Sequence, residues 1–233
     1  MKWVAGYLAA FCVLLLIIAQ SIFIPSFFMP FFDSHYQRRN IAADVGVEHG
    51  ELMRITEQLL LYMRGNRDDL VIYAQFTDGQ TRQFFTDHVE IIHMVDVMDL
   101  YVLGFQIRNI AFFTLIFIIL AMALFKVPIL LVMARCCREV IVVFLLLLII
   151  LTALIAWDFD SAFVMFHLIF FDNEYWLLDP TYSYLLRMVP INFFIEVSIF
   201  IGGLLLLFCA ALITASSIYL WPRNDTQTVA RFR

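Results

Sequence analysis

Charged residues are scarce in this chain of 233 residues: they make up 15% of it, whereas 63% is hydrophobic. Soluble globular domains carry about 25% charged and about 45–50% apolar residues, so the composition excludes an ordinary soluble globule. The net charge of −5, without any long basic run, excludes nucleic acid as a partner.

Cysteine is also rare. Two of the four cysteines, Cys12 and Cys209, lie within long apolar runs, and Cys136 and Cys137 are adjacent in a short basic segment. None falls in the acidic segments between the runs. This distribution excludes a disulfide framework there, and it leaves those segments without a cysteine nucleophile.

Four apolar runs are long enough to cross a bilayer, which takes roughly 20 residues each. We expect the spans at 1–26, 109–134, 140–157 and 191–221. In lipid every backbone polar group must be satisfied within the segment, so the runs are predicted to be helices. The first run exceeds the core of a signal peptide, about 7–15 residues, and is expected to remain attached. The predicted fold class is an all-α polytopic membrane protein.

Lysine and arginine indicate the orientation. They predominate in 126–139 and in the tail, 222–233, whereas 27–108 has seven arginines against twelve carboxylates and 158–190 one against five. Cytoplasmic segments carry the excess of Lys and Arg. We therefore expect both termini and the turn at 135–139 in the cytoplasm, with 27–108 and 158–190 outside.

The first outer segment, 27–108, is large enough to form a small α+β cap. Glu48–Met63 has apolar residues at helical spacing. Two β-prone runs flank Thr77-Asp78-Gly79, which is a hairpin signal. A further helix is expected from Asp87 to about Leu103, with a bend at Gly104 before the second span.

Two histidines stand in apolar surroundings, His93 within the predicted 87–103 helix and His167 in the second outer loop. Buried polar groups must find partners, so both are candidates for acid–base chemistry or metal binding. The plainer interpretations are a helix-surface pair of His93 with Asp96 and an interfacial ring for His167. The other three histidines adjoin charged or polar residues and are expected to be solvated: His35, His49 and His88.

No phosphate-binding glycine loop, nucleophile elbow or His-Glu-x-x-His motif occurs. The residues leave two alternatives open. One is a membrane metallohydrolase acting on lipid or lipoprotein esters, with zinc held by His93, His167 and Asp96. No tight ligand spacing supports that site, and we predict neither metal nor cofactor. The other is a non-catalytic membrane protein that binds a partner through its outer cap.

Several outer segments together form a recognisable pattern. They are Tyr62, Thr86-Asp87-His88-Val89-Glu90-Ile91-Ile92-His93-Met94-Val95-Asp96-Val97, Phe166-His167-Leu168-Ile169-Phe170-Phe171, Trp176-Leu177-Leu178-Asp179-Pro180, Leu186-Arg187-Met188-Val189-Pro190 and Phe193-Phe194. With four spans and a large first outer segment, this pattern resembles the bacterial lipoprotein intramolecular transacylase (Lit-type) family.

The resemblance implies a membrane acyltransferase. Its reaction would move the sn-2 acyl chain of a diacylglyceryl-modified lipoprotein to the α-amine of the N-terminal cysteine, giving a lyso-form lipoprotein. It further implies a multi-pass protein of the bacterial cytoplasmic membrane, in contact with membrane lipid, whose active site lies at the outer face. His93 and His167 would be the catalytic residues.

The chemistry of the amine agrees with that implication. An α-amine has a pKa of about 7.7–8.0 and a histidine about 6.5, so a histidine can act as general base without an acyl-enzyme. We predict His93 as the base and His167 as its partner or oxyanion donor, or the reverse. The further candidates for substrate binding or oxyanion stabilisation are Tyr62, Asp96, Arg187 and Trp176.

Overall fold

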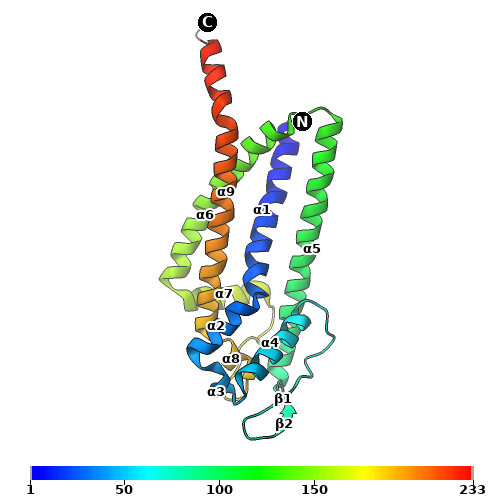
Figure 1. Ribbon diagram of the computed structural model, residues 1–233, viewed down its shortest axis with the longest axis vertical. Coiled ribbons are helices and arrows are strands. Elements are labelled where there is room, and N and C mark those ends of the chain that lie inside the picture. Colours follow the sequence, from blue (N-terminus) through cyan, green and yellow to red (C-terminus); the bar gives the residue numbers. More distant parts are fainter. Residues whose placement is uncertain (1, 232–233) are drawn as a thin grey trace. The chain divides into compact units, whose positions relative to one another are not determined.

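The computed structural model describes residues 2–231, with side chains described for residues 2–221. The expected tail, 222–233, therefore lies outside the fully described part. The elements in chain order are α1 (Lys2–Ser26), α2 (Met29–Arg39), α3 (Ile41–Val45), α4 (His49–Met63), β1 (Tyr73–Gln75), β2 (Thr81–Gln83), α5 (His88–Leu124), α6 (Ile129–Trp157), α7 (Phe159–Phe170), α8 (Tyr184–Met188) and α9 (Ile191–Arg231) (Figure 1).

Four helices in the described residues are long and apolar enough to cross a membrane: α1, α5, α6 and the Ile191–Trp221 part of α9. A two-stranded sheet lies between the first and second of them in the chain. These elements confirm the predicted fold class of a mostly helical membrane protein with a small α+β cap. The chain divides into two compact units.

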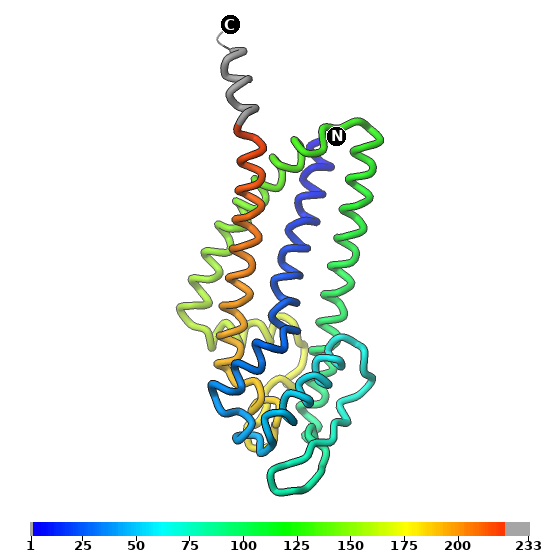
Figure 2. The backbone as a smooth tube through the Cα atoms, in the orientation of Figure 1, coloured from blue at the N-terminus to red at the C-terminus, as the bar shows by residue number. Residues whose placement is uncertain are grey.

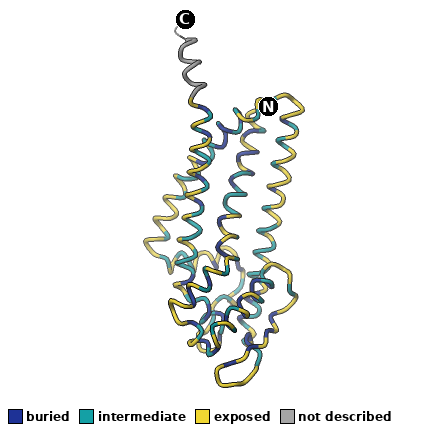
Figure 3. The backbone as a smooth tube through the Cα atoms, viewed as in Figure 1, coloured by how far each residue is buried: buried dark blue, intermediate teal, exposed yellow. Residues whose placement is uncertain are grey.

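The first unit comprises Met1–Ile22, Phe105–Asp158 and Ile201–Arg233. Its helix segments pack through small buried clusters: one contains Ala10, Met122, Val132, Cys136 and Cys137, and a second contains Leu14, Ile141 and Cys209. Much of the remaining apolar surface of α6 is exposed (Figure 3), as Leu146, Leu147 and Leu154 illustrate. A helix that exposes large apolar side chains along its length fits a lipid surrounding.

The turn between the second and third spans lies earlier in the chain than expected. Helix α5 ends at Leu124 and α6 begins at Ile129, so the turn expected at 135–139 falls inside α6. Figure 2 shows the chain reversing direction between these two green helices. Lys126 has a left-handed φ of 53°, and Pro128 precedes the first turn of α6. Proline cannot continue a preceding helix, and it was the sequence signal for this turn.

The second unit comprises Phe23–Gly104 and Phe159–Phe200 and has its own apolar core. The largest fully buried side chains of that core are Tyr36, Leu52, Ile55, Phe84, Phe85 and Met188. Strands β1 and β2 form the predicted hairpin, in the antiparallel register Tyr73↔Gln83. Gly79 in the turn has a φ of 83°, a conformation that glycine adopts without steric cost. Helix α4 corresponds to the helix predicted at Glu48–Met63.

The end predicted for this helix near Leu103 was wrong, because α5 continues as one helix from His88 to Leu124. Gly104 serves close packing instead. A Cβ at this position would lie 3.1 Å from the ring of Phe23 on α1. The missing side chain therefore lets an aromatic ring of α1 approach the α5 backbone.

Candidate active site

Two histidines from distant parts of the sequence lie side by side in the second unit. His93 comes from α5 and His167 from α7, and their ring centroids are 5.9 Å apart. Both side chains are buried, with 8% and 7% of their surface exposed. The two histidines that the sequence analysis selected for their apolar surroundings therefore lie next to each other in the structure.

The protonation of His167 is set by its own helix. Its Nδ1 lies 2.7 Å from the backbone carbonyl oxygen of Phe163, one turn earlier in α7. A carbonyl oxygen only accepts hydrogen bonds, so Nδ1 carries the proton and donates it. In the neutral ring Nε2 is then the nitrogen with the free lone pair. Burial lowers the pKa of His167, against the opposing effect of the Phe163 carbonyl, so the neutral form prevails at neutral pH.

Aromatic rings enclose the pair. Trp176 stacks on His167, with centroids 4.8 Å apart and planes at 28°. Phe171 stands edge-on to His93 at 5.3 Å and lies 5.6 Å from His167. Phe163 adds a further ring 4.4 Å from that of His167. These rings remove water from around the imidazoles, which strengthens electrostatic interactions within the site.

Two polar atoms of this cluster are buried without a hydrogen-bond partner in the described part of the chain: His93 Nδ1 and Trp176 Nε1. Buried polar groups in folded proteins are nearly always paired. The indole N–H is a donor only, whereas an imidazole nitrogen either donates or accepts. A donor and an adaptable nitrogen are therefore available to a ligand beside His167.

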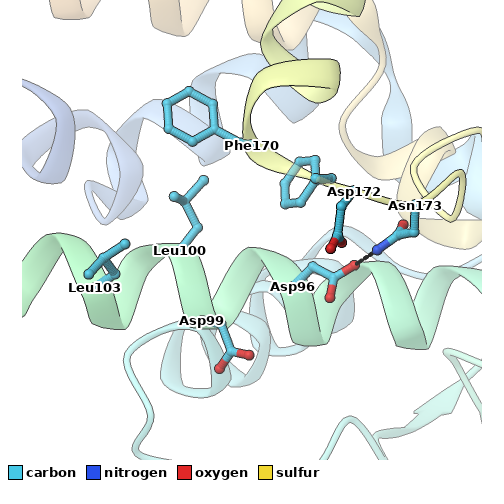
Figure 4. Close-up of a pocket in the computed structure, with 8 residues that line it drawn as sticks. Asp96, Asp99, Leu100, Leu103, Phe170, Asp172 and Asn173 are labelled. Carbon is cyan, nitrogen blue, oxygen red and sulfur yellow. Dashed lines mark hydrogen bonds between the residues drawn. The ribbon is translucent and has the colours of Figure 1, made fainter.

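A hollow of about 240 Å³ lies between α5 and the segment at the end of α7. Asp96, Asp172 and Asn173 form its polar side, and Figure 4 shows the Asp96 and Asp172 carboxylates facing the same space. The Asn173 amide donates to Asp96 Oδ2 at 2.9 Å. Leu100, Leu103, Phe170 and Phe171 form the apolar side, and Asp99 completes the lining. Phe171 belongs both to this hollow and to the ring cluster.

Comparisons with known proteins identify the family. A family model described as lipoprotein intramolecular transacylase Lit matches residues 7–194, which is more than half of the chain and includes both histidines. The chain belongs to the Lit family. Membership in an enzyme family removes the alternative of a non-catalytic binding protein. No curated protein matches the chain.

Solved structures of Lit share the fold. The in meso structure of the membrane integral lipoprotein intramolecular transacylase Lit from Bacillus cereus is 20% identical, with a TM-score of 0.73 over 97% of this chain and 98% of that one. A second structure of that protein, with a histidine replaced by arginine, is 19% identical, with a TM-score of 0.70 over 97% and 95% of the two chains. At these identities the likeness concerns the fold.

Two further candidates from the sequence lie apart from the histidine pair in this Lit-family protein. Tyr62 is buried on α4, and burial, followed by the charge of Asp99, raises the pKa of its phenol. Arg187 on α8 donates from Nε to the carbonyl of Ser183 at 3.4 Å and lies over the Tyr184 ring. Among the described contacts, neither side chain touches His93 or His167, whereas Trp176 does.

Sequence reasoning missed the buried carboxyl group of Glu90. It lies one turn before His93 on α5, has no exposed surface, and its Oε2 accepts from Ser183 Oγ at 2.7 Å and from the Leu185 backbone N–H at 3.1 Å. Ser183 is also the N-cap of α8. Glu90 thus ties the start of α8 to the helix that carries His93, and the signal was a carboxylate in an otherwise apolar stretch.

The expectation that His35 is solvated was also wrong. Its side chain is fully buried, and Nδ1 lies 2.9 Å from Glu196 Oε2. Arg38 and Arg39 pair with the same carboxylate at 2.7 and 3.1 Å. His35 therefore belongs to a structural ion cluster joining α2 to α9. Of the other two histidines expected to be solvated, His88 is exposed, and His49, with 37% of its side chain exposed, lies 2.7 Å from Asp33 Oδ1.

The zinc alternative lacks a ligand set in the described residues, where no three His, Cys, Asp or Glu side chains are grouped to hold a metal ion. Structural and catalytic zinc sites take at least three protein ligands. The histidine pair with its aromatic surround is better suited to proton transfer.

Proposed function

We propose that this Lit-family protein moves the sn-2 acyl chain of a diacylglyceryl lipoprotein to the α-amine of its N-terminal cysteine, with His167 as the general base. The hydrogen bond from His167 Nδ1 to the Phe163 carbonyl is the observation that carries the assignment, because it leaves Nε2 as the proton acceptor. This is the second of the two orders expected from the sequence. His93 is then its partner.

The proposed reaction balances without an external reagent. The amine nitrogen attacks the sn-2 ester carbonyl and forms a tetrahedral intermediate, while Nε2 of His167 takes a proton from that nitrogen. Collapse of the intermediate breaks the bond to the glycerol oxygen, and that oxygen receives the proton from the imidazolium. An ester and an amine become an alcohol and an amide. Because donor and acceptor belong to one molecule, holding it folded supplies much of the rate enhancement.

Trp176 is the proposed oxyanion donor. Its indole N–H is buried, has no acceptor in the described part of the chain, and belongs to a ring stacked on His167. A donor aimed at the developing oxyanion is worth about 10²–10³ in kcat. His93 Nδ1, also without a partner there, is a second group able to form a hydrogen bond with the reacting atoms.

The charge asymmetry supports an outer location for this site. The His-bearing segments lie within the acidic stretches 27–108 and 158–190, whereas Lys126, Arg135 and Arg138 lie at the opposite ends of α5 and α6. Excess Lys and Arg mark the cytoplasmic side. We therefore assign the histidine pair to the outer face of a bacterial cytoplasmic membrane, where it meets lipoprotein substrate and membrane lipid.

Mass spectrometry of lipoprotein N-termini tests the proposed function. Cells that express the protein should contain lipoproteins with an N-acylated cysteine and a single chain left on glycerol. Cells that express the doubly substituted His93→Ala/His167→Ala protein at equal level should retain the diacylglyceryl form. Identical N-termini in the two populations would overturn the proposal.

A further inference from the structure

Trp176 lies in an irregular segment that is mostly exposed. The segment runs from Phe171 to Ser183, between α7 and α8, and contains neither helix nor strand. Trp176 itself is half-buried, yet its ring stacks on that of His167 at 4.8 Å. A segment with so few buried side chains depends on hydrogen bonds to a rigid element for a fixed position.

The first part of this segment is hydrogen-bonded to α5 through Asn173. Its Nδ2 donates to Asp96 Oδ2 at 2.9 Å, a bond that Figure 4 shows as a dashed line. Oδ1 of the same side chain accepts from the backbone N–H of Tyr175 at 3.0 Å. Asn173 therefore connects a carboxylate of α5 to the turn that contains Trp176.

The far end of the segment is hydrogen-bonded to α5 through Glu90. Its Oε2 accepts from Ser183 Oγ at 2.7 Å and from the backbone N–H of Leu185 at 3.1 Å. Glu90 and Ser183 have no exposed surface, so water does not compete for the bond between them. Loss of a buried acceptor leaves its donors unsatisfied, which costs more than the loss of an exposed bond.

The two carboxylates stand on either side of His93. Glu90, His93 and Asp96 follow one another at intervals of three residues on α5, and residues three apart are neighbours on the surface of a helix. The helix that positions His93 therefore also supplies both anchors of the segment that brings Trp176 to His167.

We propose that Glu90 and Asp96 are positioning residues for Trp176, and that their hydrogen bonds keep its indole in place beside His167. What the indole does there, donation to the oxyanion, rests on the proposed function. In the described part of the chain, neither carboxylate forms a hydrogen bond with His93 or His167; each acts through the 171–183 segment. Misplacing a group by about 1 Å can cost about 10²-fold in rate, so anchors remote from the reacting atoms affect catalysis.

Fluorescence of Trp176 tests the positioning. The parent protein carries Trp3→Phe, Trp157→Phe and Trp221→Phe, so that Trp176 is its one indole. Glu90→Ala and Asn173→Ala in this parent should each raise the rate constant of acrylamide quenching about twofold, because the segment is freed from α5. Asp96→Ala should do the same. Since Asp96 also bears a charge close to His93, Asn173→Ala removes this anchor without removing that charge.

Conservative substitutions provide the matched controls. Glu90→Gln keeps an amide oxygen that accepts from Ser183 and Leu185, so its quenching should equal that of the parent. Glu57→Ala removes an exposed carboxylate from another helix, α4, and should also leave the quenching unchanged.

Kinetics on the diacylglyceryl peptide test whether the anchors act through the indole. Glu90→Ala and Asn173→Ala should each lower kcat at least about tenfold, with KM within about twofold of wild type. In a Trp176→Phe protein the same substitutions should lower kcat by less than about a further twofold, because the group they position is already absent. Glu90→Gln should restore kcat.

Two results would overturn the proposal. One is unchanged quenching of Trp176 in both Glu90→Ala and Asn173→Ala. The other is a loss of kcat that is as large in the Trp176→Phe protein as in wild type. If Glu90→Ala does not fold, Asn173→Ala decides, because Asn173 is half-buried on an exposed segment. A wild-type kcat in Trp176→Phe would refute the proposed oxyanion role alone, since quenching measures the position of the indole without turnover.

Discussion

His167 donates its Nδ1 proton to the carbonyl oxygen of Phe163, one turn earlier in the same helix, over 2.7 Å. This contact fixes the ring orientation and directs basicity to Nε2. Catalytic and metal-binding histidines are commonly held in one tautomer by a bond of this type. The predictions about proton transfer follow from it.

Removal of either histidine should abolish acyl transfer. A positioned general base contributes about 10²–10⁴ to the rate, so we expect His167→Ala to lose at least about a hundredfold in kcat, and His93→Ala a comparable amount. The purified proteins should unfold at wild-type temperature and be assayed on the same diacylglyceryl peptide. His88→Ala, at an exposed position on α5, is the matched control. Normal turnover by His167→Ala would assign the base elsewhere.

The lowered pKa of His167 predicts how the activity depends on pH. Burial lowers the pKa of this ring, so it remains an unprotonated base at pH values below the ordinary histidine pKa of about 6.5. Activity should fall on acidification, because the amine and then His167 become protonated. ¹⁵N NMR of histidine-labelled protein should give the Nδ1–H tautomer for His167 and a pKa below 6.5. A pKa above that value, or an Nε2–H tautomer, would contradict the assignment.

Trp176→Phe separates the indole N–H from the stacked ring. The phenyl group retains most of the contact with His167, whereas the buried donor is lost, so kcat should fall by about 10²–10³ with little change in KM. Trp157→Phe, at a 90% exposed position, should leave kcat unchanged. An unaltered kcat in Trp176→Phe would remove the indole from the oxyanion site.

Thiol labelling tests the proposed orientation of the protein in the membrane. In a protein whose four cysteines are replaced, a single cysteine at Gln80 or Glu174, both exposed, should react with a membrane-impermeant reagent in intact cells. A cysteine at the exposed Lys126 should react only after permeabilisation. Labelling of Lys126→Cys in intact cells, with protection of Gln80→Cys, would invert the topology and move the site to the cytoplasmic face.

The sequence predicted the four apolar helices and the hairpin because both depend on local patterns. Hydropathy over a window of residues identifies a span, and Thr77-Asp78-Gly79 between β-prone runs marks a turn. The turn before α6 lies at Pro128, earlier in the chain than the basic residues around Arg135 had indicated. Charge indicates the side of the membrane, whereas proline determines where a helix ends.

The sequence predicted individual residues of the site but not how they are arranged. His93 and His167 were recognisable because each stands among apolar neighbours, but their proximity depends on the packing of two helices far apart in the chain. The neighbours of His35 in the sequence predicted a solvated side chain. Its partner, Glu196, could not be identified in this way because it lies 161 residues further along the chain. The Phe163 carbonyl could not be singled out either, because every residue carries the same backbone group.

Acyl transfer within one substrate molecule, at the histidine pair, is most directly tested by a crossover experiment. Two diacylglyceryl peptides of different sequence, one with an isotopically labelled sn-2 chain, are mixed with the purified protein and analysed by fragmentation mass spectrometry. Each product should have the mass of its own substrate, with the sn-2 chain now in amide linkage to the cysteine and no label on the other peptide. The His93→Ala/His167→Ala protein should leave both substrates unchanged. Release of free fatty acid, or label on the unlabelled peptide, would contradict intramolecular transfer.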